Sequence, residues 1–190
     1  MTKMSPLLER ASETLKIEIA GLEGLIERLD AEFEQAVNLL FACQGKVILA
    51  GMGKSGLIAQ KIAATLTSTG TPSLFLHAGE SSHGDLGIIT RQDVVIVFSY
   101  SGETSEVVQM IGHIHAIGVP LIAMTGKPNS TLAKAATVHL SIAVEKEACP
   151  LGLTPTASST ATLALGDALA MCLLELRKFR EDDFAMFHPG

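Results

Sequence analysis

Five short apolar runs alternate along this chain with longer segments of helical periodicity. Each run is too short for an ordinary helix, which predicts buried strands at 46–50, 74–76, 94–98, 120–124 and 138–142. Apolar positions spaced by three and four predict helices over 57–69, after 106, over 130–136 and over 157–178. Strands that alternate with helices through short loops indicate an α/β fold, a parallel sheet covered by helices on both faces.

The first 43 residues have a different pattern. From Ser5 to Cys43 apolar residues recur every three or four positions, and no proline follows Pro6. This predicts one long amphipathic helix or a pair of helices, packed on the domain or on a partner subunit. At 190 residues we expect one domain, with a helical segment at 1–43, a core at 44–178 and a docked, apolar-rich tail at 179–190.

The turn after the third predicted strand is rich in hydroxyl groups. Residues 99–106 read Ser-Tyr-Ser-Gly-Glu-Thr-Ser-Glu and lead into a helix. A helix N-terminus offers unpaired N–H groups and the positive end of its dipole, so hydroxyls added there make a cradle for a phosphate. The alternative is an ordinary capped turn with Ser101 as N-cap, and this stretch alone favours neither.

Gly51 to Gly56 form a G-x-G-x-x-G pattern between a strand and a helix. The pattern is typical of dinucleotide binding, but the second strand then needs an acid at its end, where His77 stands instead. It is not a phosphate-binding Walker loop, because Ile48 occupies the position of the first required glycine. The simplest interpretation is a tight turn. Lys54 and Ser55, however, suit a small phosphorylated ligand.

Every polar turn of this sequence follows a predicted strand. In open parallel sheets ligands bind beyond the carboxyl ends of the strands, near a switch in strand order. The turns at 51–56, 77–85, 99–106 and 125–129 are therefore expected to meet at one edge. This convergence is stronger evidence for a binding site than any one motif.

Composition narrows the class of protein. A net charge of −6 argues against a nucleic-acid partner. The three cysteines are scattered, which fits a reducing compartment with buried or inert thiols. The N-terminus lacks a signal-peptide pattern and no apolar run reaches about 18 residues, so we expect a cytoplasmic protein without a membrane span.

Several titratable residues are candidates for chemistry at that edge. His77 and His83 share one loop with Glu80 and Asp85, but their spacing fits no strong zinc pattern, and only His83 is expected to face a substrate. In the stretch 145–152, which follows the fifth strand, carboxylates are candidate bases, while Cys149 has no obvious base partner. His113 and His115 are interpreted as surface or interface residues, and His139 as structural.

Seven stretches together resemble the sugar isomerase (SIS) domain and, within it, the arabinose-5-phosphate isomerases of Kdo and capsule biosynthesis. They are 51–56, 68–72, 83–87, 101–103, 146–153, 166–170 and 188–190. The resemblance implies a three-layer αβα sandwich with a five-stranded, flavodoxin-like parallel sheet, in a homo-oligomer that is often a tetramer. It implies interconversion of ribulose 5-phosphate and arabinose 5-phosphate, feeding lipopolysaccharide or capsule synthesis, and a short form without the CBS domains that many members carry.

The resemblance also implies roles for individual residues. The catalytic set is Lys54, Glu106, Glu147 and His188, with Glu106 preferred to Glu103 as the acid of its helix. The substrate-binding set is Gly53, Ser55, His83, Ser99, Ser101 and Thr104. No metal or cofactor is required, although a divalent metal such as zinc binds near His83 and inhibits. The tail histidine serves a neighbouring subunit's site, and Tyr100 stands where the family often has a small polar residue.

The expected reaction is a metal-independent aldose–ketose isomerisation through a cis-enediol. Glu147 is the preferred base, Lys54 and His83 stabilise the enediolate, and Glu106 and His188 assist proton transfer to oxygen. Two alternatives remain open: a non-catalytic phosphosugar-binding regulator and an isomerase for another sugar phosphate. A nicotinamide enzyme is a more distant alternative. No nucleic acid or membrane is expected as a partner.

Overall fold

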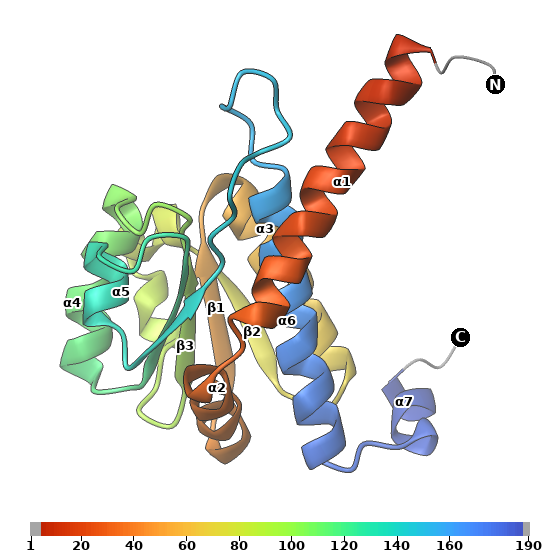
Figure 1. The fold of residues 1–190 in the computed structure, drawn as a ribbon. Helices are drawn as coiled ribbons and strands as arrows, with labels where there is room; N and C mark the ends of the chain where they lie inside the picture. The colour runs from red at the N-terminus through yellow and green to blue at the C-terminus, as the bar shows by residue number, and fades with distance from the viewer. Residues whose placement is uncertain (1–4, 188–190) are drawn as a thin grey trace.

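The computed structural model describes residues 5–187, and a five-stranded, wholly parallel sheet lies at its centre (Figure 1). The strands are β1 (Val47–Gly51), β2 (Ser73–His77), β3 (Val94–Phe98), β4 (Leu121–Thr125) and β5 (Val138–Ser141). Their order is β2-β1-β3-β4-β5. The predicted α/β class and all five strands are confirmed.

Helices lie before, between and after the strands. They are α1 (Pro6–Glu27), α2 (Ala31–Ala42), α3 (Gly53–Ser68), α4 (Ser105–Ile117), α5 (Thr131–Ala135), α6 (Ala157–Leu176) and α7 (Glu181–Phe187), with 3₁₀ turns η1 (Ala78–His83) and η2 (Asp85–Ile88). The N-terminal segment is the pair of helices, because the chain turns between α1 and Asp30, whose carboxylate caps α2. The loop predicted at 77–91 contains the two 3₁₀ turns.

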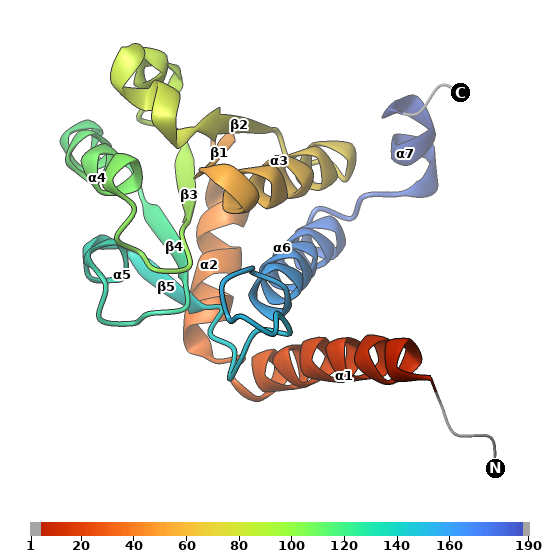
Figure 2. The ribbon, with the colours of Figure 1, turned by 90° about the horizontal axis from the view of Figure 1, so that it is seen from above.

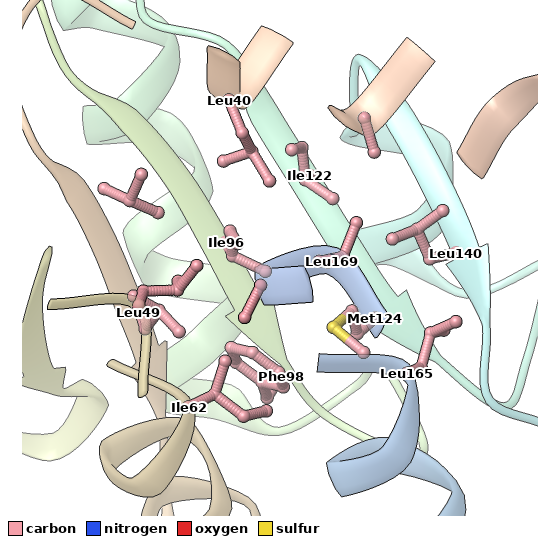
Figure 3. Close-up of a cluster of buried hydrophobic side chains, with 14 of the residues drawn as sticks. Leu40, Leu49, Ile62, Ile96, Phe98, Ile122, Met124, Leu140, Leu165 and Leu169 are labelled. Carbon is pink, nitrogen blue, oxygen red and sulfur yellow. The ribbon is translucent and has the colours of Figure 1, made fainter. Parts of the chain in front are cut away.

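Side chains of each strand alternate between two apolar cores, one on each face of the sheet. Leu49, Ile96 and Phe98 face the core under α2, α3 and α6, which Figure 3 shows in close-up. Ile48 and Val97 face the second core, under α4 and α5. Figure 2 shows these helices on opposite sides of the sheet, with α1 outside α6. The three layers of the expected sandwich are confirmed.

The helix α6 is long and apolar enough to cross a membrane, by length and composition alone. This differs from the expectation that no segment qualifies, because small and hydroxyl residues interrupt a run that is still apolar on average. Half of its candidate span is buried in the protein. At Gly166 an added β-carbon would collide with Ile62 of α3, so the two helices pack in close contact. In this structure α6 is a core helix.

The first half of α1 exposes apolar side chains that no other part of residues 5–187 covers. Leu7, Leu8 and Leu15 are 83%, 58% and 60% exposed, and Figure 1 shows this part of α1 extending away from the sheet. Only the second half packs down, where Gly21 and Leu25 are buried. The apolar face of α1 is therefore longer than the surface that the rest of residues 5–187 offers to cover it.

A buried ion pair closes the amino end of the sheet. The Asp93 carboxylate accepts hydrogen bonds from the Lys46 backbone N–H (2.8 Å), the Lys46 ammonium (3.0 Å) and the Thr90 N–H (2.8 Å). Burial by itself would raise the pKa of Asp93, but these donors hold it below its ordinary value. This pair ties β3 to the start of β1.

Candidate active site at the carboxyl edge of the sheet

The strand order places a switch point between β1 and β3. From β1 the chain connects to β2 on one side, and from β3 to β4 on the other. In register, Gly51 at the end of β1 lies between His77 and Phe98, the last residues of β2 and β3. Helices that start on either side of such a point leave a crevice where ligands bind in this class of sheet.

The first side of the crevice is the start of α3. An added β-carbon at Gly51 or Gly56 would lie 3.1 Å from backbone atoms of the other, so the helix begins in direct contact with the strand. The helix starts at Gly53, four residues earlier than its apolar pattern predicts, with φ +55° there. Lys54 is exposed, and no carboxylate within residues 5–187 forms an ion pair with it. A free cation thus stands beside a helix N-terminus.

The second side is the turn 99–104. Ser99 is buried, and its hydroxyl accepts the Gly102 N–H (3.1 Å) and pairs with the Thr104 hydroxyl (3.0 Å). The exposed Ser101 hydroxyl accepts the Glu103 N–H (3.2 Å). The alternative interpretation of Ser101 as N-cap is wrong, because α4 begins after Thr104. The hydroxyls therefore shape a turn that presents the α4 N-terminus to the crevice.

The two acids near this turn have different surroundings. The Glu103 carboxylate accepts the Thr131 N–H (2.7 Å) and hydroxyl (2.9 Å), so it caps α5. Glu106 accepts the Ser105 hydroxyl (2.7 Å), which lowers the pKa of its carboxyl. His77 adds a smaller electrostatic contribution in the same direction. Of the two acids, Glu103 is therefore bound to a second helix and Glu106 is not. The choice of Glu106 as the catalytic acid stays a prediction.

The β2 side contributes histidines from η1. His77 accepts the Gly79 N–H at its Nδ1 (3.2 Å) and caps the turn, while His83 is exposed at its end. Within residues 5–187 no group of three His, Cys, Asp or Glu side chains is arranged to hold a metal ion. His139 bonds the buried Thr125 hydroxyl (3.0 Å), as expected of a structural residue.

Glu147 lies at the start of α6. Its Oε2 accepts the Thr156 N–H (2.7 Å), the Thr156 hydroxyl (2.9 Å) and the Ser158 N–H (3.3 Å). Burial by itself would raise its pKa, but the donors of Ser158 and Thr156 hold it below the ordinary value. The Ser158 side chain adds to this lowering, so two residues at the start of α6 hold the carboxylate in place.

Cys149 does not fit the expectation of a buried or inert thiol. It is half-buried, in the loop between β5 and α6. Backbone N–H groups of Thr154 and Leu153 lower its pKa to about 7. The sequence held no signal for this, because the donors are backbone groups placed by the loop conformation.

The tail forms the helix α7, in which every residue except Asp183 is exposed, so it packs less closely than the predicted docked segment. Phe187 stacks on Phe179 with ring centroids 5.9 Å apart. It borders a cavity of about 680 Å³ whose wall includes Thr67 and Leu74, from the end of α3 and the start of β2. The predicted catalytic His188 lies outside the described residues.

The structure thus brings the predicted residues together in two groups. Gly53, Lys54, Ser55, His83 and the 99–106 turn follow the neighbouring strands β2, β1 and β3, whereas Glu147 follows β5, two strands beyond β3. The sequence analysis missed Thr156, whose place before a long apolar helix is a typical N-cap signal. It also missed the reach of Tyr100 towards β5, which has no sequence signal.

A family model for the SIS domain matches residues 40–172 of this chain. Arabinose 5-phosphate isomerase KdsD of Salmonella typhi is 53% identical over 182 residues, which cover 96% of this chain and 56% of that protein. KdsD of Pseudomonas aeruginosa is 50% identical over 190 residues, which cover 100% of this chain and 58% of that protein. The chain thus spans a little over half the length of these relatives.

A solved structure gives the same result for the fold. The E. coli CFT073 protein c3406, in complex with arabinose 5-phosphate, superposes with a TM-score of 0.94 at 42% identity, covering 99% of this chain and 100% of that one. Both comparisons extend over the sheet, the crevice and the loop that carries Glu147.

Proposed function

Because this chain belongs to the SIS domain family, we propose that it interconverts D-ribulose 5-phosphate and D-arabinose 5-phosphate. The relatives named KdsD act as arabinose 5-phosphate isomerases, and about half of all residues are identical over nearly the whole chain. The observation that carries the proposal is the switch point between β1 and β3. There α3 and α4 both begin just beyond the strand ends, and Lys54, in the first turn of α3, forms no ion pair within residues 5–187. Such a site favours a dianion.

The substrate phosphate binds at the turns 53–55 and 99–104. The N-termini of α3 and α4 supply N–H donors and dipoles, and Ser55, Ser101 and Thr104 supply hydroxyls. Anchoring the phosphate fixes the distance from it to C1 and C2 of the sugar. Gly53, which has open space around its α-carbon, lets the backbone approach the ligand closely.

Glu147 is the base that moves the proton between C1 and C2 through a cis-enediol. Its lowered pKa makes it a weak base, but it keeps the carboxylate charged across the physiological range. The carboxylate can take the proton while Thr156 and Ser158 hold it in place.

Four further residues complete the reaction. Lys54, with His83, stabilises the negative charge that develops on the enediolate oxygens. Glu106 and His188 move protons at the sugar oxygens. Phe187 borders the end of α3, whereas Lys54 lies in its first turn. We therefore propose that His188 serves the site of a second copy.

We also propose that the protein acts as a cytoplasmic homo-oligomer, most simply a tetramer. The apolar first half of α1 needs a cover that the described part of the chain does not supply. The use of His188 between subunits would link assembly to catalysis. The free cysteines fit a reducing compartment. The product would enter lipopolysaccharide or capsule synthesis, as the Kdo pathway of the relatives suggests.

Proton NMR with ribulose 5-phosphate in D₂O tests the function. We expect arabinose 5-phosphate with deuterium at C2, at the same rate with and without EDTA. Binding without turnover would overturn the isomerase proposal in favour of a phosphosugar-binding regulator. Turnover of a different sugar phosphate alone, in a panel of pentose, hexose and heptose phosphates, would overturn the substrate assignment. A rate lost in EDTA would contradict the metal-independent mechanism.

A further inference from the structure

Tyr100 connects three strands at the carboxyl edge of the sheet. It lies two residues beyond the end of β3, within the proposed phosphate-binding turn. Its ring covers Gly126, just beyond β4, so closely that a β-carbon there would lie 2.5 Å from Cε2. Its hydroxyl accepts the N–H of Val144 (3.3 Å), three residues beyond β5. Adjacent strands lie about 4.8 Å apart, so this one side chain reaches across the whole of β4.

Both ends of this connection are well anchored. The Tyr100 carbonyl accepts the Gly126 N–H (2.9 Å), which fixes the start of the side chain. Val144 also packs against α1, where a β-carbon at Gly21 would lie 3.3 Å from it. Tyr100 and Val144 both join the apolar core under α6. The Tyr100 ring is therefore fixed over Gly126 and its hydroxyl is fixed on Val144. Glu147 lies three residues after Val144.

We propose that Tyr100 is a positioning residue that holds the segment 142–148, and with it Glu147, at a fixed distance from the phosphate-binding turn. The inference rests on the proposed isomerase function. The phosphate binds after β1 and β3, whereas the base follows β5, so two groups that must act on one small substrate lie on separate segments. Within residues 5–187, the Tyr100–Val144 contact is the one hydrogen bond that joins the 99–104 turn to segment 142–148.

The same geometry separates binding from catalysis. The turn keeps its shape without the Tyr100 hydroxyl, because Ser99, Thr104 and Glu103 bond to other partners. The α6 end of the loop keeps its shape too, because Thr156 holds Glu147. The β5 end of the segment is also held, by the Ile142 N–H on the Thr125 carbonyl (2.9 Å) and by Arg28 on the Ala143 carbonyl (2.6 Å). Loss of the hydroxyl would therefore loosen the stretch from Val144 to Glu147 and its distance from the turn. That distance determines whether the base meets C1 and C2 of an anchored substrate.

The test uses Tyr100→Phe, which removes the hydroxyl and leaves the ring over Gly126. We expect kcat to fall about tenfold while KM changes by less than about twofold, since a misplaced base affects the chemical step alone. Gly126→Ala displaces the ring and leaves the hydroxyl, and we expect at least the same loss of kcat. Ser73→Ala is the matched control, because its hydroxyl bonds the Thr71 carbonyl at the opposite end of the sheet. It should match the parent chain.

A second measurement does not depend on turnover. Hydrogen–deuterium exchange is followed by mass spectrometry with and without inorganic phosphate. In the parent chain we expect phosphate to slow exchange in both 99–104 and 142–148. In Tyr100→Phe the slowing should persist in 99–104 and disappear in 142–148.

These two measurements separate the proposals. Parental kcat in Tyr100→Phe, or a raised KM with kcat unchanged, would overturn the positioning role. So would phosphate protection of 142–148 that survives the substitution. A parent chain without isomerase activity would overturn the proposed function, while the exchange result would still decide whether Tyr100 couples the two segments.

Discussion

Three titratable residues of this chain have pKa values set by hydrogen-bond donors more than by neighbouring charges. Glu147 is held by the N-terminus of α6, Cys149 by N–H groups of its own loop, and Asp93 by N–H groups and one lysine. In each case the charged form is favoured. The consequence is a set of pH-dependent properties that can be checked one residue at a time.

Cys149 should be the most reactive thiol of the chain at neutral pH. Because its pKa is lowered to about 7, half of it is thiolate there, and the thiolate is the nucleophile. We expect the rate of alkylation by iodoacetamide, followed by peptide mass spectrometry, to be half-maximal near pH 7. Cys43 and Cys172 in the same sample are internal references. A half-maximal rate near pH 9 at Cys149 would contradict the expectation.

Asp93 should contribute stability that is lost only in acid. Its folded pKa lies below the ordinary value of 3.8, so the contribution is complete above that value and is lost as the pH falls through the folded pKa. Asp93→Asn should lower the free energy of unfolding by about 2–3 kcal/mol at pH 7, measured in urea. The difference from the parent chain should shrink below pH 3.8.

Asp167→Asn is the control for that measurement. Its carboxylate pairs with Lys61 at 2.5 Å, but both side chains are more than 40% exposed. We expect a loss under about 1 kcal/mol. Equal losses in the two variants would show that burial of Asp93 has no energetic importance.

At the scale of elements, the start of α6 combines structure and chemistry. The helix is long and apolar, and the N–H groups of its first turn need hydrogen-bond acceptors. The side chain of the N-cap residue Thr156 does not accept any of them. Glu147 provides one, from nine residues earlier, and Ala148 in turn donates to the Thr156 hydroxyl (2.8 Å). A helix cap and a proposed base are thus the same carboxylate.

Thr156→Val should move the acid limb of the pH–rate profile. The substitution removes one donor to Glu147, so the pKa of that carboxyl rises toward its ordinary value. The charged form is the base, and the rate of isomerisation should then fall at a higher pH than in the parent chain. Stability should decrease by about 1 kcal/mol as well.

Thr160→Val is the control on the same helix. Its hydroxyl bonds Glu18 of α1 (3.1 Å) and does not touch Glu147. It should cost stability without moving the acid limb. An unmoved limb in Thr156→Val would show that Glu147 is not the group whose ionisation controls the rate.

The elements themselves were largely predictable from sequence. Strands such as Val94–Phe98 are continuous apolar runs because both faces are buried, and periodicity located α6 almost to the residue. The start of α3 was missed because glycine has low helix propensity, and contact with β1 overrides it. The grouping of turns 51–56 and 99–106 followed from topology alone. Pairs such as Glu147 with Thr156 could not be predicted, because loop conformation decides them.

For the molecule as a whole, the main unsatisfied feature of a single copy is the first half of α1, whose apolar face is exposed to solvent. An amphipathic helix is stable in water chiefly when its apolar face is packed. Here that face continues well beyond the part that contacts α6. Assembly with further copies would bury it.

Leu15→Glu and Ile19→Glu together should therefore reduce the molar mass in solution. Both side chains are more than half exposed, so the fold of one copy should persist by circular dichroism. Light scattering after size-exclusion chromatography should show a tetramer for the parent chain and smaller species for the variant. Ala116→Glu, at an exposed position of α4, should leave the mass unchanged. A parent chain that elutes as a monomer would contradict the proposed assembly.

The contact of Tyr100 across β4 also has a spectroscopic consequence. The chain has one tyrosine and no tryptophan. Its ultraviolet fluorescence therefore arises almost entirely from a single side chain, at the boundary between the phosphate-binding turn and the Glu147 segment. Arrival of a sugar phosphate at this edge should change that emission without any label. During unfolding the same signal would report the separation of these two segments, while circular dichroism reports the loss of helices elsewhere.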